Sequence, residues 1–416
     1  MRKVCGLMLL GIFLSWGCNE DPTPSLFNPE KYDQTRENVP EITAIAPADS
    51  SYAGVGTLTI TGMNFSPVEP YNDNNQVLFN NVIANIVSMT ATEITVASPV
   101  IVGDSLSVKI YSKGAQQYSD PVSYKLKPAV QIAGGLVSTD FATALAGDGS
   151  NNIYVSVHGA FEDIIKIIAP DGTGSTYAGT SFLNANGMAY GPGNMLYCAI
   201  AAGRVKQIKT IDPAGVEATY KTVTQIPIDL DFDQDLSLWM VGRASTTTLT
   251  PSDIVRIKAD GTMETMATMD TYLKCVRVYV DGGTPYIYLA GSNTATGEKK
   301  IWRREIQGDG SLGTEQVVLD VAGSSWLNGS TVQSVTFSAD GLMYIATDAS
   351  PDAMFIYDPV SQSHEVLYPG LIGPKIYDIV WDEGAYIYAT QQEGETSATI
   401  LKIDVGKKGA PYYGRP

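Results

Sequence analysis

The sequence predicts an all-β protein in which an N-terminal β-sandwich is followed by a six-bladed β-propeller. Beyond the first 18 residues, no long stretch shows the 3.6-residue periodicity of a helix. Short runs of alternating polar and apolar residues recur instead, such as 58–61 and 105–110, bounded by Gly, Asp, Asn and Pro. From about Pro128 a longer unit repeats six times, which favours a ring of similar sheets.

The first 17 residues have the pattern of a signal peptide. A basic start, 1–3, precedes the apolar run 4–14, which is too short to cross a bilayer as a helix. A small residue then precedes Cys18, and this arrangement resembles a lipobox, in which the Cys becomes the acylated N-terminus. The bulky Trp16 departs from that pattern, and an ordinary cleaved signal peptide is the alternative.

Residues 18–39 are expected to form a flexible tether. They are polar, acidic and rich in Pro, and they lack a periodic apolar pattern. Glu20 and Asp21 directly follow Cys18 and resemble the surface-export signal of Bacteroidota lipoproteins. The resemblance implies a lipid-anchored protein of the cell envelope, in the outer membrane and exposed at the cell surface.

Composition excludes some classes of partner. The 416 residues include 27 basic and 44 acidic side chains, a net charge of −17, and no Lys/Arg cluster suited to nucleic acid. No later segment reaches roughly 18 continuous apolar residues, so a lipid would be the sole membrane attachment. Cys198 and Cys275 lie in apolar strand-like runs and are expected to be buried free thiols, with a disulfide as the alternative.

Residues 40–127 are predicted to form the sandwich. The opening P-x-I-x-x-I-x-P at 40–47 and the strand and turn I-x-G-x-N-F at 60–65 resemble the IPT/TIG immunoglobulin-like domain. Gly62 and Asn64 suit a turn with unusual backbone angles. In that family such domains often serve as spacers beside a larger functional module.

Residues 128–416 are predicted to form the propeller. In each copy an apolar strand, a turn and a second strand ending in Tyr or Trp precede a third strand; the copies start at Ala144, Gly187, Asp229, Val276, Ser334 and Asp378. Closure into a ring covers the faces that one blade cannot bury alone. Residues 129–132 are expected to close the last blade, and five or seven blades are the alternatives. The repeats resemble NHL-type and gluconolactonase-like (SMP-30) propellers.

Ligand-binding residues are expected on the propeller face formed by the loops leading into each blade and by those between second and third strands. Sugar recognition needs a flat aromatic ring and side chains that satisfy hydroxyl groups. Trp326 is the first stacking candidate because it stands in a polar loop; packing between blades is the alternative for each aromatic residue. The remaining candidates are Asn328, Phe182, Phe161, Tyr377 and Arg243.

A metal site is a second hypothesis. Gluconolactonase-like propellers hold a divalent ion with oxygen ligands at the channel mouth, and Asn186, Asp229 and Asp378 occupy comparable positions, which would suit Ca²⁺. Cys275 and Gln333 stand where further ligands are expected, which puts this ion in doubt. The Asp-rich run 229–235 alternates as a strand does, so a solvated strand face or turn is favoured over a calcium loop.

The architecture as a whole resembles accessory lipoproteins of Bacteroidota glycan-uptake (Sus-like) systems. The resemblance implies a non-enzymatic protein without a cofactor, which captures a poly- or oligosaccharide beside an outer-membrane transporter complex. A metal-dependent lactonase, esterase or lyase and a protein–protein adaptor are the alternatives. No nucleophile-elbow, zinc-protease or P-loop motif is present in the sequence.

Overall fold

The computed structural model describes residues 39–244, 251–394 and 397–415, which form two compact units. Cys18, the signal segment and the tether lie outside the described residues. No helix among the described residues is long and apolar enough to cross a membrane. The all-β fold class, a sandwich followed by a six-bladed propeller, is confirmed.

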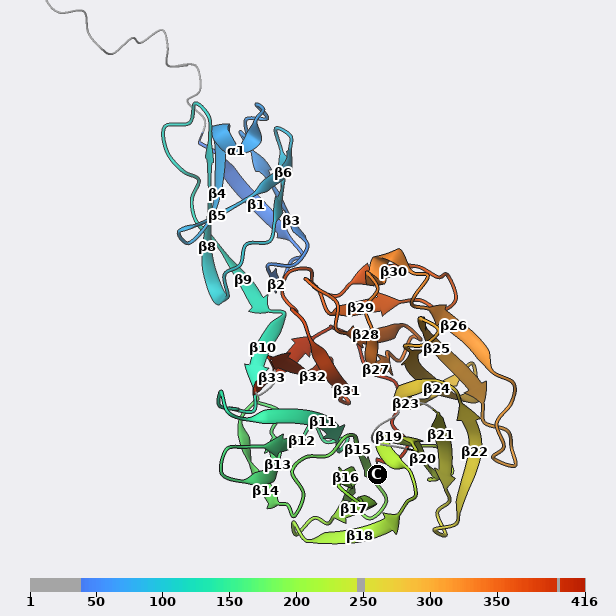
Figure 1. Ribbon diagram of the computed structural model, residues 1–416. Helices are drawn as coiled ribbons and strands as arrows, with labels where there is room; N and C mark the ends of the chain where they lie inside the picture. The colour runs from blue at the N-terminus through green and yellow to red at the C-terminus, as the bar shows by residue number, and fades with distance from the viewer. Residues whose placement is uncertain (1–38, 245–250, 395–396, 416) are drawn as a thin grey trace, which may run out of the picture. The chain divides into compact units, whose positions relative to one another are not determined.

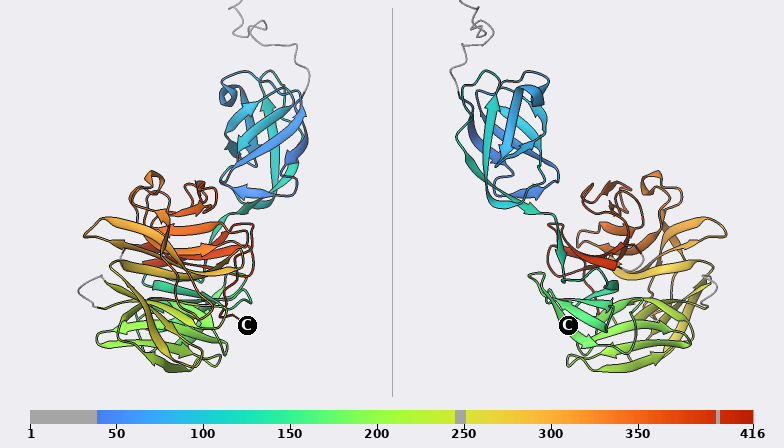
Figure 2. Two further views of the ribbon diagram at one scale, coloured as in Figure 1. Left: turned by 90° about the vertical axis from the view of Figure 1, so that its right-hand side faces the viewer. Right: turned by 60° about the vertical axis from the view of Figure 1, so that its left-hand side comes forward.

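The sandwich consists of two β-sheets and one short helix, shown from two further directions in Figure 2. Its strands alternate between buried and exposed residues, as in Thr57–Met63, where Leu58 and Ile60 are fully buried. One sheet, in spatial order, contains β1 (Glu41–Ala46), β3 (Thr57–Met63), β7 (Glu93–Ala97) and β6 (Ile86–Met89). The other contains β2 (Ser51–Ala53), β9 (Val122–Pro128), β8 (Gly103–Ser112), β4 (Asn75–Phe79) and β5 (Val82–Ala84), and α1 spans Tyr71–Asn74.

Gly62 and Asn64 have the special roles that the sequence indicates, for two different reasons. A Cβ atom at Gly62 would lie 1.9 Å from the carbonyl oxygen of Glu41, so only glycine allows β1 and β3 to approach there. Asn64 has a φ of 63°, and its side-chain amide donates to the carbonyl of Val39 at 2.9 Å.

The propeller consists of six four-stranded antiparallel sheets around a common centre (Figure 1). The first strand of each blade is innermost. Blade 1 contains β11 (Phe141–Gly147), β12 (Ile153–His158), β13 (Asp163–Ile168) and β14 (Gly174–Gly179). Blade 2 contains β15 (Met188–Gly191), β16 (Met195–Ala202), β17 (Val205–Ile211) and β18 (Glu217–Thr222), and blade 3 contains β19 (Ile226–Phe232), β20 (Leu238–Arg243), β21 (Ser252–Ile257) and β22 (Met263–Met269). Blade 4 contains β23 (Tyr272–Asp281), β24 (Thr284–Asn293), β25 (Glu298–Glu305) and β26 (Gln316–Asp320), and blade 5 contains β27 (Val332–Phe337), β28 (Met343–Thr347), β29 (Met354–Tyr357) and β30 (His364–Val366).

Blade 6 joins the two ends of the propeller sequence. Its inner strands are β31 (Ile376–Trp381), β32 (Tyr386–Glu393) and β33 (Ser397–Asp404), and its outer strand is β10 (Val130–Ala133). The register runs from Val130 opposite Ile403 to Ala133 opposite Ile400. This pairing confirms that the strand at 129–132 closes the last blade.

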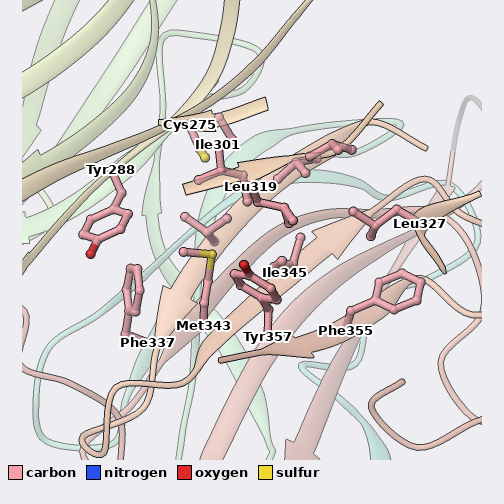
Figure 3. Packing of buried hydrophobic residues seen from close by; sticks show 14 of the residues in the cluster. Cys275, Tyr288, Ile301, Leu319, Leu327, Phe337, Met343, Ile345, Phe355 and Tyr357 are labelled. Atoms are coloured by element: carbon pink, nitrogen blue, oxygen red, sulfur yellow. The ribbon is translucent and has the colours of Figure 1, made fainter. Parts of the chain in front are cut away.

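Apolar clusters between neighbouring blades hold the ring together. Figure 3 shows the cluster between blades 4 and 5, in which the rings of Tyr288 and Phe337 lie 4.6 Å apart. Phe337 also stacks on Tyr279 at 4.2 Å. Cys198 and Cys275 are both buried and free, as expected. Each blade therefore buries its faces against its neighbours, as the repeat pattern requires.

Candidate functional site

A cavity of about 150 Å³ lies where the inner strands of the propeller begin. We call it the mouth cavity. Side chains from blades 2, 3, 4, 5 and 6 line it, so it belongs to the ring as a whole. They are Asn186, Ile228, Asp229, Arg243, Tyr272, Lys274, Cys275, Gln333, Tyr377 and Asp378.

A β-bulge near the start of four inner strands explains how these side chains reach the cavity. The register shifts between Pro227 and Asp229 in blade 3, and equivalent shifts occur in blades 4, 5 and 6. In each strand the extra residue lines the mouth cavity: Ile228, Lys274, Gln333 and Tyr377. A bulge redirects a side chain without interrupting the strand, and here it does so in four of the six blades around one opening.

Asp229 and Asp378 lie side by side at the cavity and also connect the blades. The Asp229 carboxylate accepts hydrogen bonds from the backbone N–H groups of Leu230 and Val276, each at 2.9 Å. Asp378 accepts from the N–H of Leu145 at 2.9 Å and from the Ser334 hydroxyl at 3.0 Å. Both carboxylates therefore bond to a neighbouring blade while facing the cavity.

Burial disfavours the charged form of both acids. It raises the pKa of Asp378 to about 6. Burial, and then the charge of Asp378, raise the pKa of Asp229 well above its ordinary value. The pKa of the Cys275 thiol is also raised by burial, so this thiol stays protonated near neutral pH. The part of the mouth cavity lined by Asp229, Cys275 and Asp378 thus holds less negative charge than these residue types suggest.

The C-terminal segment fills the channel below the mouth cavity. The remaining void there is about 30 Å³, room for about one water molecule, and Tyr412, Gly414 and Arg415 line it. The Arg415 guanidinium donates to the carbonyls of Gly147 and Trp381, each at 2.8 Å. A ligand in the mouth cavity therefore enters and leaves at the same end.

The structure separates the predicted binding residues into two groups. Tyr377 and Arg243 line the mouth cavity. Trp326 instead packs on the outer strands of blade 5, with its ring stacked 4.3 Å from that of His364 and 6.1 Å from that of Tyr357. Phe182 is buried in an inter-blade cluster, Phe161 is fully exposed, and Asn328 ends a 3₁₀ turn with a φ of 48°. None of these four lines the mouth cavity.

The predicted metal residues come together, but they do not fit a divalent cation well. Asn186, Asp229 and Asp378 all line the mouth cavity. The Asn186 amide donates to the carbonyl of Pro227 at 2.8 Å, and both carboxylates accept the hydrogen bonds given above. The described residues hold no group of three His, Cys, Asp or Glu side chains placed to bind a metal, and the cations of Arg243 and Lys274 share the cavity. A hard cation prefers more anionic oxygen and no neighbouring ammonium group.

Sequence reasoning missed Tyr272 and Lys274. Both precede the fourth repeat as it reads in the sequence, because the bulge adds one residue before the regular alternation begins. Asp229 and Asp378 each directly follow the bulge residue of their strand, and the equivalent residue in blade 4 is Cys275, one position before Val276. Aligning the fourth repeat on Cys275 would have identified Lys274. Gly187 marks the close approach of Asp229 in the sequence, because a Cβ atom at this position would lie 2.6 Å from a carboxylate oxygen of Asp229.

Comparisons with known proteins agree with this architecture. The family model of the IPT/TIG domain matches residues 40–126. No curated protein matches the chain in sequence. A proposed phosphatase from Bacteroides thetaiotaomicron superposes with a TM-score of 0.56 at 12% identity, covering 90% of this chain and 98% of its own. A proposed gluconolactonase superposes with a TM-score of 0.50 at 14% identity, covering 68% and 94%. An auxiliary nutrient binding protein from Bacteroides ovatus gives a TM-score of 0.47 at 11% identity, covering 89% and 99%.

The fold and the family match define the class of protein. It is an all-β protein in which an IPT/TIG immunoglobulin-like domain precedes a six-bladed propeller, whose fold is similar to that of a proposed gluconolactonase. At these identities the structural likeness concerns the fold alone.

Proposed function

We propose that this chain is a carbohydrate-binding protein of the cell surface, lipid-anchored at Cys18, which takes its ligand in the mouth cavity. The observation that carries the proposal is the cavity itself, which gathers polar side chains from five blades at one opening. A concave site with a few convergent polar groups is the usual setting for a small ligand.

The size and lining of the mouth cavity suit one sugar residue. A cavity of about 150 Å³ takes a six-membered ring. Tyr272 and Tyr377 offer rings and hydroxyl groups, Asn186 and Gln333 offer amides, and Arg243 offers guanidinium donors. Burial raises the pKa of Tyr377 to about 12, so its hydroxyl remains a donor. Sugar hydroxyls need this mixture of donors and acceptors.

Binding is favoured over catalysis by the same residues. A metal-assisted lactonase would need oxygen ligands that are free to bind the ion, whereas both carboxylates here accept hydrogen bonds and share the cavity with Arg243 and Lys274. The Cys275 thiol is protonated and therefore a poor nucleophile. Asp229 and Asp378 already accept hydrogen bonds from neighbouring blades, which suits a structural role more than proton transfer.

Isothermal titration against oligosaccharides that bind on a glycan array tests the site. Tyr377→Ala and Gln333→Ala are expected to weaken binding at least tenfold, since each removes a cavity wall or a hydrogen-bonding group worth about 1.4 kcal/mol or more. Trp326→Ala serves as the control, because this ring lies outside the cavity. Binding that is lost in the control and kept in the two cavity variants would move the site to the Trp326 loop.

Anchoring is tested separately. Metabolic labelling with a radioactive fatty acid should mark the wild-type chain and leave Cys18→Ala unlabelled. Protease added to whole cells should digest the protein if it faces the medium. Equal labelling of both chains would exclude Cys18 as the lipid site, and full protection in intact cells would place the protein inside the envelope.

A further inference from the structure

Three cationic side chains gather at the mouth cavity. Arg243 and Lys274 lie against the same ring, that of Tyr272, at 5.4 and 4.7 Å from its centroid. Lys375 lies 5.5 Å from the centroid of the neighbouring Tyr377 ring and is close enough to act on Lys274 through its charge. In a chain with a net charge of −17, such a group of cations is unexpected.

These cations differ from the other inward-facing arginines in having no carboxylate within 4 Å in the described part of the chain, although the charge of Asp348 acts on Lys274 from further away. Arg277 pairs with Asp231 at 3.1 Å and Arg256 with Asp233 at 3.8 Å. Among the described residues, Arg243, Lys274 and Lys375 form no ion pair within 4 Å. A partly buried charge is costly unless an opposite charge compensates it.

Arg243 also has an unsatisfied donor. Its buried Nε atom has no hydrogen-bond partner among the described residues. Arg256 and Arg304 share that property, but each has a carboxylate within 4 Å, which Arg243 lacks. A buried donor without a partner is destabilising, so an acceptor supplied by a ligand would relieve it.

The charge of the site is therefore uneven. Arg243 ends β20, and Lys274 lies near the start of β23. Both therefore lie at the end of the propeller where the inner strands begin. Asp229 and Asp378 lie further along their strands, where their oxygens accept backbone N–H groups. Burial, and then the charge of Lys375, lower the pKa of Lys274, which indicates that positive charge there is incompletely compensated. An anionic group is stabilised at the cationic side and hydroxyl groups at the acidic side.

We propose that the mouth cavity binds the terminal residue of an acidic oligosaccharide, with the carboxylate of the sugar held between Arg243 and Lys274. The inference rests on the proposed function and names its ligand class. A guanidinium matches a planar carboxylate with two parallel hydrogen bonds. Only a chain end or a single sugar fits, because the C-terminal segment closes the channel below.

A matched pair of ligands tests this directly. Uronic-acid oligosaccharides and their carboxyl-reduced neutral counterparts, which have the same rings and linkages, are titrated into the purified protein. The acidic member is expected to bind at least tenfold more tightly, and the difference should shrink as salt is raised. A sulfated neutral oligosaccharide serves as a third arm, and it should bind more weakly than the uronate.

Two variants and one control assign the cations. Arg243→Gln and Lys274→Gln should each lower affinity for the acidic ligand at least tenfold, and each should lower affinity for the neutral ligand by a clearly smaller factor. Arg243→Lys should restore part of the loss. Arg204→Gln, at an exposed turn of blade 2, removes the same net charge and should change neither affinity. Thermal unfolding of each variant shows whether it is folded.

The outcomes separate the two proposals. Equal affinity for the acidic and neutral oligosaccharides would overturn the acidic ligand and leave carbohydrate binding standing. Tighter binding of the sulfated sugar would overturn the carboxylate. Loss of acidic binding equally in Arg204→Gln would show a general charge effect and overturn the assigned residues. Failure of every oligosaccharide, acidic or neutral, would remove carbohydrate binding itself.

Discussion

Replacing Tyr412 with Phe tests whether the C-terminal segment is held inside the channel. The Tyr412 hydroxyl accepts a hydrogen bond from the backbone N–H of Trp381 at 3.0 Å and lies 3.0 Å from the hydroxyl of Thr336. Both partner residues are fully buried. The ring lies between Arg277 and Arg415, 3.0 and 4.1 Å from its centroid, and these contacts are kept in Phe.

The expected loss of stability follows from the groups left unpaired. Tyr412→Phe removes one oxygen and leaves the N–H of Trp381 buried without a partner, at a cost of about 1–3 kcal/mol. With a urea m-value of about 3 kcal/mol/M, the midpoint of unfolding should fall by about 0.3–1 M. Tryptophan fluorescence reports on the propeller alone in a chain that starts at residue 19, because residues 19–127 contain no Trp.

Tyr413→Phe is the matched control. Tyr413 is the adjacent tyrosine, and its hydroxyl makes no hydrogen bond within the described part of the chain, so its loss should cost less than about 0.5 kcal/mol. Equal midpoints for the two variants would refute the reasoning, and the segment would then not be bonded as described.

Three further predictions concern Asp231, Asp378 and Trp326. Asp231→Ala should lower the free energy of unfolding by about 3–5 kcal/mol in urea titrations, because it leaves Arg277 buried without its carboxylate, whereas the double variant with Arg277→Met should cost less. Affinity for an acidic oligosaccharide should fall several-fold between pH 5 and 7, because the raised pKa of Asp378, about 6, means that a negative charge develops beside the ligand as pH rises; a neutral ligand titrated over the same range should show no such trend. Trp326→Ala should lower stability by about 2 kcal/mol in thermal unfolding and change affinity less than twofold, and a tenfold loss of binding would contradict its placement.

The fold was largely predictable because its signals are local and repeated. Each blade carries the same alternation and an aromatic residue in its second strand, so errors in one copy are corrected by the others. This aromatic residue was expected at the end of the second strand, whereas it lies near the start, as Trp239 does in β20. The closing strand at 129–132 was predictable for a related reason: a ring of six similar units needs a fourth strand for its last blade. The Asp-rich run forms a strand and a turn as predicted, with Asp231 in β19 and Asp233 in the turn that follows. The expected solvent exposure was wrong, because both side chains are buried and bonded to buried partners.

The site was only partly predictable because it depends on contacts between distant segments. Asn186, Asp229 and Asp378 could be aligned from their repeats, and they do meet. The packing of Trp326 was not predictable because its partners, Tyr357 and His364, lie in strands that follow it, so its loop alone does not show them. Lys274 was missed because a bulge shifts it by one residue, and alternation alone does not reveal bulges.

The closing strand of blade 6 also sets the order in which the protein can be completed. Val130 pairs with Ile403, so 403 − 130 = 273 positions separate two residues that share a ladder. During synthesis β10 emerges before every other propeller strand, and the edge that pairs with β33 stays without its partner until β33 has been made. The entropic cost of such a long loop grows only slowly with length, but contacts so distant in sequence slow folding. A chain cut short before β33 would therefore lose its last strand and would also leave β10, the first propeller strand, without a partner. Completion of the ring is in this sense all-or-none.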